Sequence, residues 1–435
     1  MAKKTDEVIR RDREVFLTTT RQSYPFVAER GEGDFAYDIE GREFIDFTSF
    51  ISVYNMGVNS SREVREAIKG QVDKLMHAAF TDYYSELPVE FGEMLIRMFP
   101  KGFGKIFLSN SGTEANEAAI KFSKLFTKRH YTIAFYNSFH GRTNGSLGMT
   151  ASKAVQRENF GPFTGVVHVP FAYCYRCPFN SEYPGCGLSC VDYIRKYPLS
   201  KEVSPKEVAA IFTEPIQGEG GYIVPPKGYF KEIKRITEEH GMLLISDEVQ
   251  AGYMRTGKFL AMDNFGVEAD IYTMAKSIGA GLPMGATVAR RSLGDIPAGS
   301  HSNTFGGNLA AVAGAKASLG HLMKNRKGIE AMVMLKGAKM KKALERMAER
   351  HGLIGDVRGI GMMLAIELVK DRRSKEPAVK EREEVIKNAY RKGLLLLPAG
   401  ESSIRIIPPL TISEGSMVKG LEILEESIKM ASKRK

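Results

Sequence analysis

The feature that most constrains the fold of this chain is a series of short apolar runs separated by stretches long enough to form helices. The runs lie at Lys105–Leu108, Thr132–Tyr136, Val208–Phe212, Met242–Ile245 and Asp270–Met274. Continuous apolar runs of this kind are typical of strands that are buried on both faces of a parallel sheet. Their alternation with helix-forming stretches predicts an α/β domain in which helices cover both faces of a mostly parallel sheet.

The sequence pattern differs on either side of this region. Residues 5–20 are typical of a surface helix, and Phe35–Phe47 alternates apolar and polar residues around a Glu-Gly turn, which predicts a hairpin. After about residue 330, a Lys-, Glu-, Ala- and Met-rich helix through Arg350 and two later apolar segments predict a smaller α+β domain. We therefore expect an N-terminal segment over residues 1–61 that packs with the small domain, a large domain over 62–330 and the small domain over 331–435.

Composition and charge limit the classes of function. With 43% hydrophobic and 26% charged residues over 435 positions, the chain is neither disordered nor fibrous. Its net charge of +11 is compatible with nucleic acid, an anionic surface or small anionic ligands, but the basic residues are spread along the chain apart from a Lys433–Lys435 tail, and no nucleic-acid-binding motif accompanies them. No apolar run approaches the ~20 residues of a membrane span, and the first residues are charged. We expect a cytoplasmic protein with neither nucleic acid nor membrane as a partner.

Polar residues gather where the apolar runs end. These clusters are Ser109–Glu114, Phe139–Arg142, Thr213–Pro215, Asp247–Gln250 and Ala275–Ser277. In an open α/β sheet, ligands bind at the edge formed by the carboxyl ends of the strands. Five such clusters predict one composite site at that edge.

Each cluster alone is a weak indicator of a ligand. The Ser111-Gly-Thr-Glu stretch begins a helix whose first N–H groups attract an anion such as phosphate, although such a start is most often only a cap. Phe139 is suited to stack on a flat ligand and Arg142 to bind a carboxylate, but a core Phe and a surface Arg fit equally well. Glu214 and Glu219 follow the next run, and loop carboxylates are usually solvated unless cations lie beside them.

Asp247 and Lys276 form the most informative pair, because each stands at the end of its own apolar run. A desolvated lysine beside other positive charge has a lowered pKa and can form a Schiff base. A carboxylate against a heterocyclic nitrogen keeps that nitrogen protonated. These are the two groups that pyridoxal phosphate (PLP) requires, since its protonated ring withdraws electrons from the substrate. Taken alone, the pair also fits a buried salt bridge.

Taken in order, the motifs resemble those of the class III PLP-dependent aminotransferases, most closely the 4-aminobutyrate and ornithine branch. They are Ser111-Gly-Thr-Glu-Ala-Asn, Phe139-His-Gly-Arg-Thr, Thr213-Glu-Pro-Ile-Gln-Gly-Glu-Gly-Gly, Asp247-Glu-Val-Gln-Ala-Gly-Tyr-Met-Arg-Thr-Gly, Lys276 and Asn303-Thr-Phe-Gly-Gly-Asn. The resemblance extends from the hairpin near residue 35 to Ile412. It implies the fold of a fold type I PLP-dependent transferase and a homodimer with shared active sites, either alone or within a larger assembly.

The resemblance assigns a role to each matching residue. The implied cofactor site consists of Ser111, Gly112, Thr113, Phe139, His140, Glu214, Asp247, Val249, Gln250, Lys276 and, from the neighbouring subunit, Thr304. Within it, Lys276 is the Schiff-base lysine and the proton shuttle, and Asp247 pairs with the ring nitrogen. Phe139 and Val249 cover the two faces of the ring. Lys276 and Asp247 are the implied catalytic residues.

The resemblance also implies a substrate site formed by Ile51, Arg142, Glu219 and Arg405. Arg405 binds the α-carboxylate of 2-oxoglutarate or glutamate, and Arg142 binds the distal carboxylate of 4-aminobutyrate. Glu219 pairs with Arg405 when an ω-amino donor, which lacks that α-carboxylate, occupies the site. The expected function is a ping-pong transfer of an amino group from an ω-amino donor, such as 4-aminobutyrate or ornithine, to 2-oxoglutarate. Phe50 stands where a small residue is expected, which bears on donor size.

Two alternative functions stay open at this point. One is a PLP-dependent amino-acid racemase of the same family, which needs a second acid/base group on the opposite face of the substrate. Racemases that resemble this family carry Asp where Glu219 stands, which favours transamination. The other is a non-enzymatic PLP-binding regulatory protein, but the chain shows no added DNA-binding segment and retains Asp247 and Lys276.

All four cysteines lie close together, with the spacing Cys174-x2-Cys177-x8-Cys186-x3-Cys190. Such a cluster among prolines and glycines is compatible with a structural zinc knuckle, with disulfides or with free thiols. Because it lies away from the catalytic motifs, we assign it a structural role and predict no metal at the active site.

Overall fold

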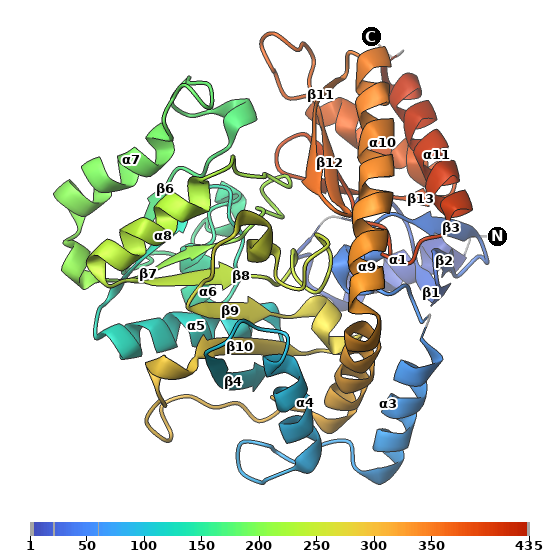
Figure 1. Ribbon diagram of the computed structural model, residues 1–435. Helices are drawn as coiled ribbons and strands as arrows, with labels where there is room; N and C mark the ends of the chain where they lie inside the picture. Colours follow the sequence, from blue (N-terminus) through green and yellow to red (C-terminus); the bar gives the residue numbers. More distant parts are fainter. Residues whose placement is uncertain (1–3, 21, 60, 433–435) are drawn as a thin grey trace. The chain divides into compact units, whose positions relative to one another are not determined.

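A computed structural model describes residues 4–20, 22–59 and 61–432. The basic tail Lys433–Lys435 lies outside these residues. The chain divides into two compact units, unit 1 formed by Met1–Ser61 with Met332–Lys435, and unit 2 formed by Arg62–Ala331 (Figure 1).

Unit 2 contains a seven-stranded sheet in the order β4-β10-β9-β8-β7-β5-β6 (Figure 1). Its strands are β4 (Phe103–Ser109), β5 (Tyr131–Phe135), β6 (Val166–Val169), β7 (Val208–Thr213), β8 (Leu243–Asp247), β9 (Ile271–Met274) and β10 (Gly285–Arg290). The strands from β9 to β6 run parallel, and β10 runs antiparallel to both neighbours. The predicted α/β fold with a mostly parallel sheet is confirmed. The five apolar runs are β4, β5, β7, β8 and β9, whereas β6 and β10 were missed.

Unit 2 also contains helices, some of which pack against this sheet. They are α3 (Arg62–Lys74), α4 (Glu86–Ile96), α5 (Gly112–Thr127), α6 (Asn144–Met149), α7 (Ser189–Lys196), α8 (Tyr229–His240) and the part of α9 (Leu309–Arg350) up to Ala331. Short helical turns connect them: η1 (Ala154–Gln156), η2 (Cys174–Arg176), η3 (Pro198–Glu202), η4 (Pro205–Glu207), η5 (Ala261–Phe265), η6 (Lys276–Gly279) and η7 (Arg291–Leu293). Ala118 and Ala119 of α5 pack in one buried cluster with Phe212 and Ile245 of the central strands. These small side chains bring α5, and with it the residues at its N-terminus, close to the sheet.

Unit 1 contains two four-stranded sheets, ordered β1-β2-β3-β13 and β11-β12-β15-β14. The strands are β1 (Ala28–Glu32), β2 (Phe35–Asp38), β3 (Glu43–Asp46), β11 (Ile354–Ile360), β12 (Met363–Leu368), β13 (Leu394–Leu395), β14 (Leu397–Ala399) and β15 (Ser403–Ile406). The helices are α1 (Lys4–Val15), the remainder of α9, α10 (Val379–Arg391) and α11 (Glu414–Ser432), while α2 (Ser49–Ser52) is a single turn with positive φ. The predicted hairpin is confirmed as β2 and β3.

Aromatic stacking fixes the N-terminal hairpin within unit 1. The ring of Tyr390 lies 4.8 Å from that of Tyr24 and 5.1 Å from that of Phe44, nearly parallel to both.

The predicted helix over residues 5–20 was too long, because α1 ends at Val15. The β-branched run Thr18–Thr20 explains the difference, since such residues lose side-chain freedom in a helix.

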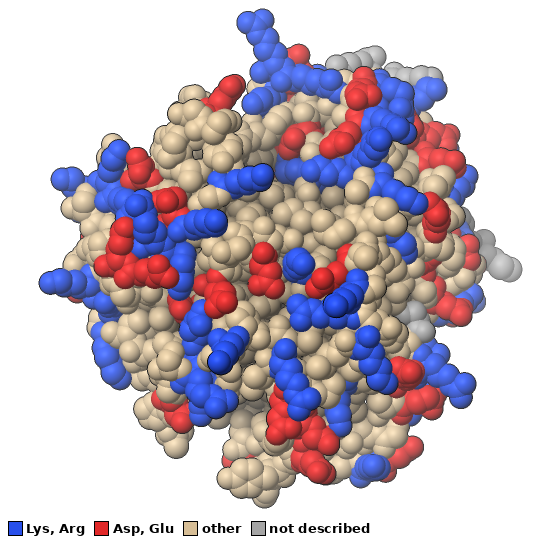
Figure 2. All heavy atoms as spheres, viewed as in Figure 1, with Lys and Arg blue, Asp and Glu red and all other residues tan. Residues whose placement is uncertain are grey.

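The charged surface shows no single basic patch around α7 and α8, where blue and red side chains alternate (Figure 2). Several of them pair with one another, including Arg195 with Glu239, Arg235 with Glu232 and Lys196 with Asp192. Within the described residues, every helix lacks either the length or the apolar character needed to span a membrane.

Candidate active site

The N-terminus of α5 is built by the Ser111-Gly-Thr-Glu stretch as a reciprocal cap. Ser111 Oγ accepts a hydrogen bond from Glu114 N (3.2 Å), and the Glu114 carboxylate accepts from Asn110 N (2.7 Å) and Ser111 Oγ (3.0 Å). Gly112 and Thr113 occupy the first two helical positions, whose N–H groups have no acceptor within a helix. The hydroxyl of Ser111 thus serves the cap, and the two N–H groups that follow are suited to an anion.

Gly112 brings three segments of the site together. A Cβ placed on Gly112 would lie 2.8 Å from Val249 Cγ1 and 3.5 Å from Ala275 Cβ. The start of α5 therefore touches the loop after β8 and the end of β9, immediately before Lys276. A side chain at position 112 would force these segments apart, so only glycine fits at this close approach.

Strands β8 and β9 are adjacent and parallel (Figure 1). Asp247 ends β8 and Lys276 closely follows β9, so both lie at the same edge of the sheet. Asp247 is in register with Thr273, and Glu248 N donates to Thr273 O at 2.9 Å. Lys276 follows three residues later with φ = 52°, in the left-handed region. A non-glycine residue held there costs about 1 kcal/mol, and such residues cluster at functional sites.

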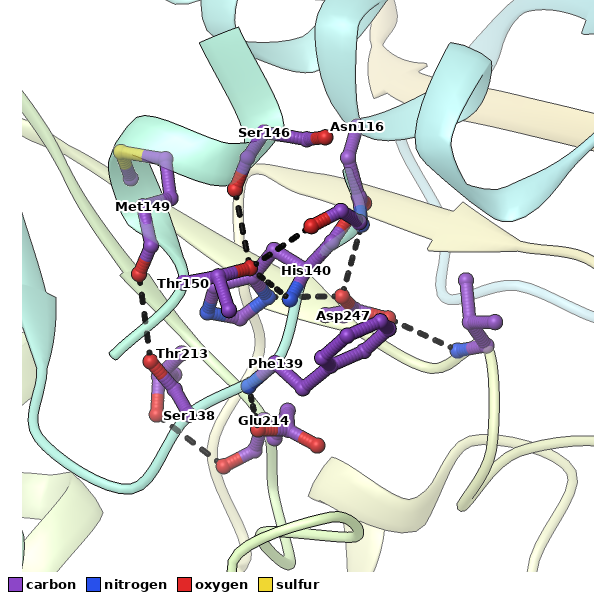
Figure 3. A network of polar contacts seen from close by, with 12 residues as sticks. Asn116, Ser138, Phe139, His140, Ser146, Met149, Thr150, Thr213, Glu214 and Asp247 are labelled. Carbon is purple, nitrogen blue, oxygen red and sulfur yellow. Dashed lines mark hydrogen bonds and ion pairs between the residues drawn. The ribbon is translucent and has the colours of Figure 1, made fainter. Parts of the chain in front are cut away.

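The carboxylate of Asp247 is held by three donors in a buried network (Figure 3). Asp247 Oδ2 accepts from His140 Nδ1 at 2.7 Å and from Asn116 Nδ2 at 2.8 Å, and Oδ1 accepts from Val249 N at 3.0 Å. The imidazole of His140 is also fixed by an edge contact with the Phe212 ring, 4.7 Å between centroids. The carboxylate is thereby oriented by the protein alone.

Asn116 is a site residue that the sequence analysis did not assign. It lies one helical turn after Gly112, and therefore on the same side of α5 as that glycine. Its Nδ2 also lies 2.6 Å from His140 O, which ties α5 to the loop that carries Phe139. The signal in the sequence was an amide four residues after Gly112, a spacing that puts both residues on one face of a helix.

Glu214 joins two loops of the site. Its Oε2 accepts from Phe139 N at 3.0 Å (Figure 3). Its Oε1 accepts from Gly218 N at 2.9 Å. Complete burial raises the pKa of Glu214 to about 7. A Cβ on Gly218 would lie 2.8 Å from Gln250 Cδ, so the Gly218 loop packs directly against Gln250.

Phe139 and Arg142 lie together on the loop after β5. The guanidinium carbon of Arg142 is 4.9 Å from the centroid of the Phe139 ring, a cation–π distance. Beside them, Thr113 Oγ1 lies 2.6 Å from Ser146 Oγ and 2.9 Å from Thr143 Oγ1. The structure thus brings Thr113 and the Phe139 loop together, as the predicted site requires.

Glu219 forms an ion pair with a residue that the sequence analysis did not single out. Lys153 Nζ lies 2.7 Å from Glu219 Oε1, with the side chains 40% and 21% exposed. Arg405, the partner implied by the resemblance, belongs to unit 1, where it is buried and donates through Nε to Pro398 O at 2.9 Å. The pairing of Glu219 with Arg405 stays a prediction.

Ile51 also belongs to unit 1 and lies in an unusual turn. Ser49, Phe50, Ile51 and Ser52 all have positive φ, between 46° and 65°. Thr48 Oγ1 stabilises the turn by accepting from Phe50 N at 3.1 Å. The β-branched Ile51 is strongly disfavoured in this conformation, and its side chain is 42% exposed. Its contact with substrate stays a prediction.

Thr304 lies in an exposed segment, as a residue that reaches a neighbouring subunit would. Thr81 Oγ1 donates to Asn303 O at 3.1 Å, and the rings of His77 and Phe305 lie 4.8 Å apart. These contacts order the segment within one chain. The predicted contact of Thr304 with a cofactor in the partner subunit remains a prediction.

The four cysteines are thiols that line one small cavity together with apolar residues such as Phe171 and Pro226. Burial raises the pKa of the Cys190 thiol to about 12. Across residues 4–20, 22–59 and 61–432, no three His, Cys, Asp or Glu side chains are arranged to hold a metal ion. The zinc knuckle considered from the spacing therefore receives no support.

The residues brought together fit PLP. The glycine cradle at the start of α5 suits its phosphate, the held carboxylate of Asp247 suits its ring nitrogen, and Lys276 suits its aldehyde. Val249 and Phe139 supply apolar surface beside this position.

Comparison with known proteins identifies relatives over nearly the whole chain. The family model described as "Aminotransferase class-III" matches residues 17–428. A leucine/methionine racemase of Thermococcus litoralis is 40% identical over 425 residues, 97% of this chain and 95% of the relative. A probable 4-aminobutyrate aminotransferase of Bacillus subtilis is 35% identical over 409 residues, 93% of each chain. Among solved structures, the taurine:2-oxoglutarate aminotransferase of Bifidobacterium kashiwanohense, in complex with PLP and glutamate, matches with a TM-score of 0.91 at 27% identity, covering 100% of this chain and 99% of that one.

Proposed function

Since the chain belongs to the class III aminotransferase family and is a PLP-dependent enzyme, we propose that it moves an amino group from an ω-amino donor to 2-oxoglutarate in a ping-pong cycle. The donors we favour are 4-aminobutyrate, ornithine and similar amines. The observation that carries the proposal is that Asp247 and Lys276 leave adjacent parallel strands beside the Gly112 cradle. The similarity to a probable 4-aminobutyrate aminotransferase supports the choice of donor class.

Each residue of the site has a separate role in the proposed reaction. PLP, when bound, supplies an electron-withdrawing ring that stabilises negative charge on the reacting carbon of the substrate. Asp247 holds the proton on the ring nitrogen, and His140 and Asn116 hold Asp247. The N–H groups of Gly112 and Thr113 bind the phosphate. Lys276 Nζ would hold the cofactor, and its amine would carry the proton away from the donor carbon.

The substrate carboxylates are assigned to two arginines. We propose that Arg142 binds the distal carboxylate and that Arg405 binds the α-carboxylate of glutamate or 2-oxoglutarate, with Ile51 lining the pocket. Arg405 is 6% exposed, so its charge needs a partner when the donor has no α-carboxylate. Glu219 is the partner that we propose for that half-reaction.

The experiment that tests this proposal is a donor panel on the purified holoenzyme with 2-oxoglutarate as acceptor. Formation of glutamate from 4-aminobutyrate or ornithine is the expected result. Glutamate formation from none of the ω-amino donors would overturn the choice of donor class. Omission of the acceptor is the control, because a ping-pong enzyme then stops after one turnover per site.

A racemase is the second candidate, favoured by the 40% identity to the leucine/methionine racemase of Thermococcus litoralis. Racemisation needs an acid/base group opposite Lys276, and it proceeds without an oxo-acid. Incubating L-leucine or L-methionine with the holoenzyme alone and following optical rotation separates the two functions. Loss of rotation without an acceptor would favour the racemase. The non-enzymatic alternative is set aside, because the family and the fold are those of PLP enzymes.

We also propose a homodimer in which Thr304 reaches the cofactor of the neighbouring subunit. Exposed apolar and aromatic side chains near this segment support an interface there, among them Met76, Tyr83, Tyr84 and Phe305. Sedimentation equilibrium tests the dimer, and a monomer with full activity would contradict it. The cytoplasmic location expected from the sequence remains a prediction that cell fractionation tests.

A further inference from the structure

Three hydroxyl groups meet beside the N-terminus of α5 and form a cluster that the proposed mechanism does not use. Thr113 Oγ1 lies 2.6 Å from Ser146 Oγ and 2.9 Å from Thr143 Oγ1, and the last two oxygens lie 2.9 Å apart. Thr113 belongs to the first turn of α5, whereas Thr143 and Ser146 belong to the start of α6. This hydroxyl cluster of Thr113, Thr143 and Ser146 therefore joins the proposed phosphate site to the segment after Phe139.

The backbone at Gly141 makes room for the hydroxyl cluster. A Cβ at this position would collide with Thr113 Oγ1 and Ser146 Oγ. The φ of Gly141 is 137°, which a residue with a side chain rarely adopts. The chain therefore passes directly over the pair of hydroxyls, and any side chain at position 141 would displace them.

The carboxylate of Glu117 sets the direction of the hydrogen bonds in the cluster. Glu117 lies one helical turn after Thr113, and its Oε1 accepts from Thr143 Oγ1 and, at 2.9 Å, from Ser146 N. An ionised carboxylate only accepts, so the Thr143 proton is committed to Glu117. Thr143 Oγ1 can then only accept within the cluster, and the protons left to distribute are those of Thr113 and Ser146.

Ser146 is placed to donate its proton to Thr113. Its side chain is completely buried, so water does not compete for the hydroxyl, and its backbone O accepts from Thr150 Oγ1 at 3.0 Å (Figure 3). Thr113 Oγ1, at 2.6 Å, is closer to Ser146 Oγ than the other acceptors, Thr143 Oγ1 at 2.9 Å and Thr143 O at 3.3 Å. When Ser146 donates to Thr113, the proton of Thr113 itself is left for a group outside the cluster.

We propose that Ser146 is a positioning residue that directs the proton of the Thr113 hydroxyl to the cofactor phosphate. This inference rests on the part of the proposed function that assigns the phosphate to the start of α5, and it is independent of the amino donor. The N–H groups of Gly112 and Thr113 supply backbone donors there, and the hydroxyl adds a side-chain donor to the same anion. Because a hydrogen bond to a charged acceptor is about twice as strong as a neutral one, the direction of this one proton affects affinity.

The test compares the affinity of the full-length apoenzyme for PLP with its affinity for pyridoxal, which lacks the phosphate, by absorbance titration. Ser146→Ala should raise the dissociation constant of PLP about fivefold or more and leave that of pyridoxal unchanged. Thr113→Val should show the same selective loss, and Thr113→Ser should retain the wild-type ratio because it keeps the hydroxyl. Ser123→Ala is the matched control, since it removes another completely buried serine hydroxyl, which donates to Ile120 O within α5.

A double-mutant cycle separates the orientation of Thr113 from support of the fold. In a Thr113→Val background there is no hydroxyl proton to direct, so Ser146→Ala should not change the ratio of the two dissociation constants further. Equal losses of affinity for PLP and pyridoxal, an unchanged ratio in Ser146→Ala, or a further selective loss in the Thr113→Val background would each overturn the inference and leave the phosphate assignment intact. A wild-type protein that binds PLP no more tightly than pyridoxal would overturn both.

Discussion

His140 Nδ1 donates to Asp247 Oδ2 at 2.7 Å, and both side chains are almost completely buried. Asn116 donates to the same oxygen, so one carboxylate oxygen is held by two side chains while the other accepts from Val249 N. Hydrogen bonds to a buried carboxylate are strong because water does not compete for it. The acid that a PLP ring nitrogen requires is therefore oriented by its own protein neighbours.

This network predicts that Asn116→Leu weakens cofactor binding. The substitution keeps the side-chain size but removes one donor to a charged acceptor, a loss of about 1.5–3 kcal/mol. The dissociation constant of PLP should then rise about 10- to 100-fold, which titration of the apoenzyme measures. An unchanged dissociation constant would show that His140 Nδ1 and Val249 N suffice to hold Asp247.

Lys276→Ala should abolish both the visible absorbance of the holoenzyme and its turnover, because the same amine binds the cofactor and carries the proton. Lys258→Ala is the matched control, since Lys258 is a partly exposed lysine that pairs with Glu330. Absorbance spectra and glutamate formation are measured on the same samples. Turnover retained at Lys276→Ala would refute the assignment of this lysine.

Gly112→Ala should disturb the site through one methyl group. The added Cβ would lie 2.8 Å from Val249, and overpacking of this kind costs about 1–3 kcal/mol. We expect the affinity for PLP to fall about 10-fold or more. Gly70→Ala in α3, where a Cβ would meet nothing within 4 Å, should leave the affinity unchanged and controls for loss of a glycine. Equal affinities in the two variants would remove the steric argument.

The sheet edge and its main residues could be predicted because the pattern is local. Asp247 and Lys276 each follow an uninterrupted apolar run, and such runs end together at one edge of a parallel sheet. Strand β10 could not be predicted in this way, because Gly285–Arg290 is rich in Gly, Ala and Thr and does not form a long apolar run. It adds the one antiparallel strand of the sheet.

Contacts between loops, and residues with strained backbone, could not be predicted from the sequence. The pairing of Lys153 with Glu219 joins residues 66 positions apart through loop geometry, which no periodic pattern encodes. The left-handed turn that contains Phe50 and Ile51 contradicts the local preference of both residues, and tertiary contacts such as Ser49 Oγ donating to Ile407 O at 2.6 Å maintain it. The same applies to the positive φ of Lys276.

Glu219→Ala should impair the ω-amino half-reaction more than the glutamate half-reaction. Without the carboxylate, the buried Arg405 has lost the partner that we propose for donors lacking an α-carboxylate. We expect the rate with 4-aminobutyrate to fall about 10-fold or more, and the rate with glutamate to change less. Stopped-flow measurement of each half-reaction checks the ratio, and equal losses would count against the exchange of partners.

The buried carboxyl of Glu214 predicts a pH dependence of stability with a definite sign. Burial raises its pKa to about 7 in the folded protein, compared with ~4.3 in an unfolded chain. Between these values the folded state binds a proton that the unfolded state does not, so the free energy of unfolding falls as pH rises. The contribution of Glu214 is fully present below the unfolded pKa and is lost as pH rises through 7.

Glu214→Gln isolates this contribution, because the amide stays neutral at every pH. Replacing one carboxylate oxygen by NH2 places a donor opposite one of the two backbone donors, Phe139 N or Gly218 N, and so removes one hydrogen bond. The destabilisation caused by losing that bond does not depend on pH. The test is therefore the slope: from pH 5 to 8 the wild type should lose up to ~3 kcal/mol relative to the variant, measured by urea unfolding. Other titrating groups, such as His168, whose pKa burial lowers to about 4, are common to both proteins and cancel. Parallel curves would mean that Glu214 is already ionised in the folded protein at pH 5.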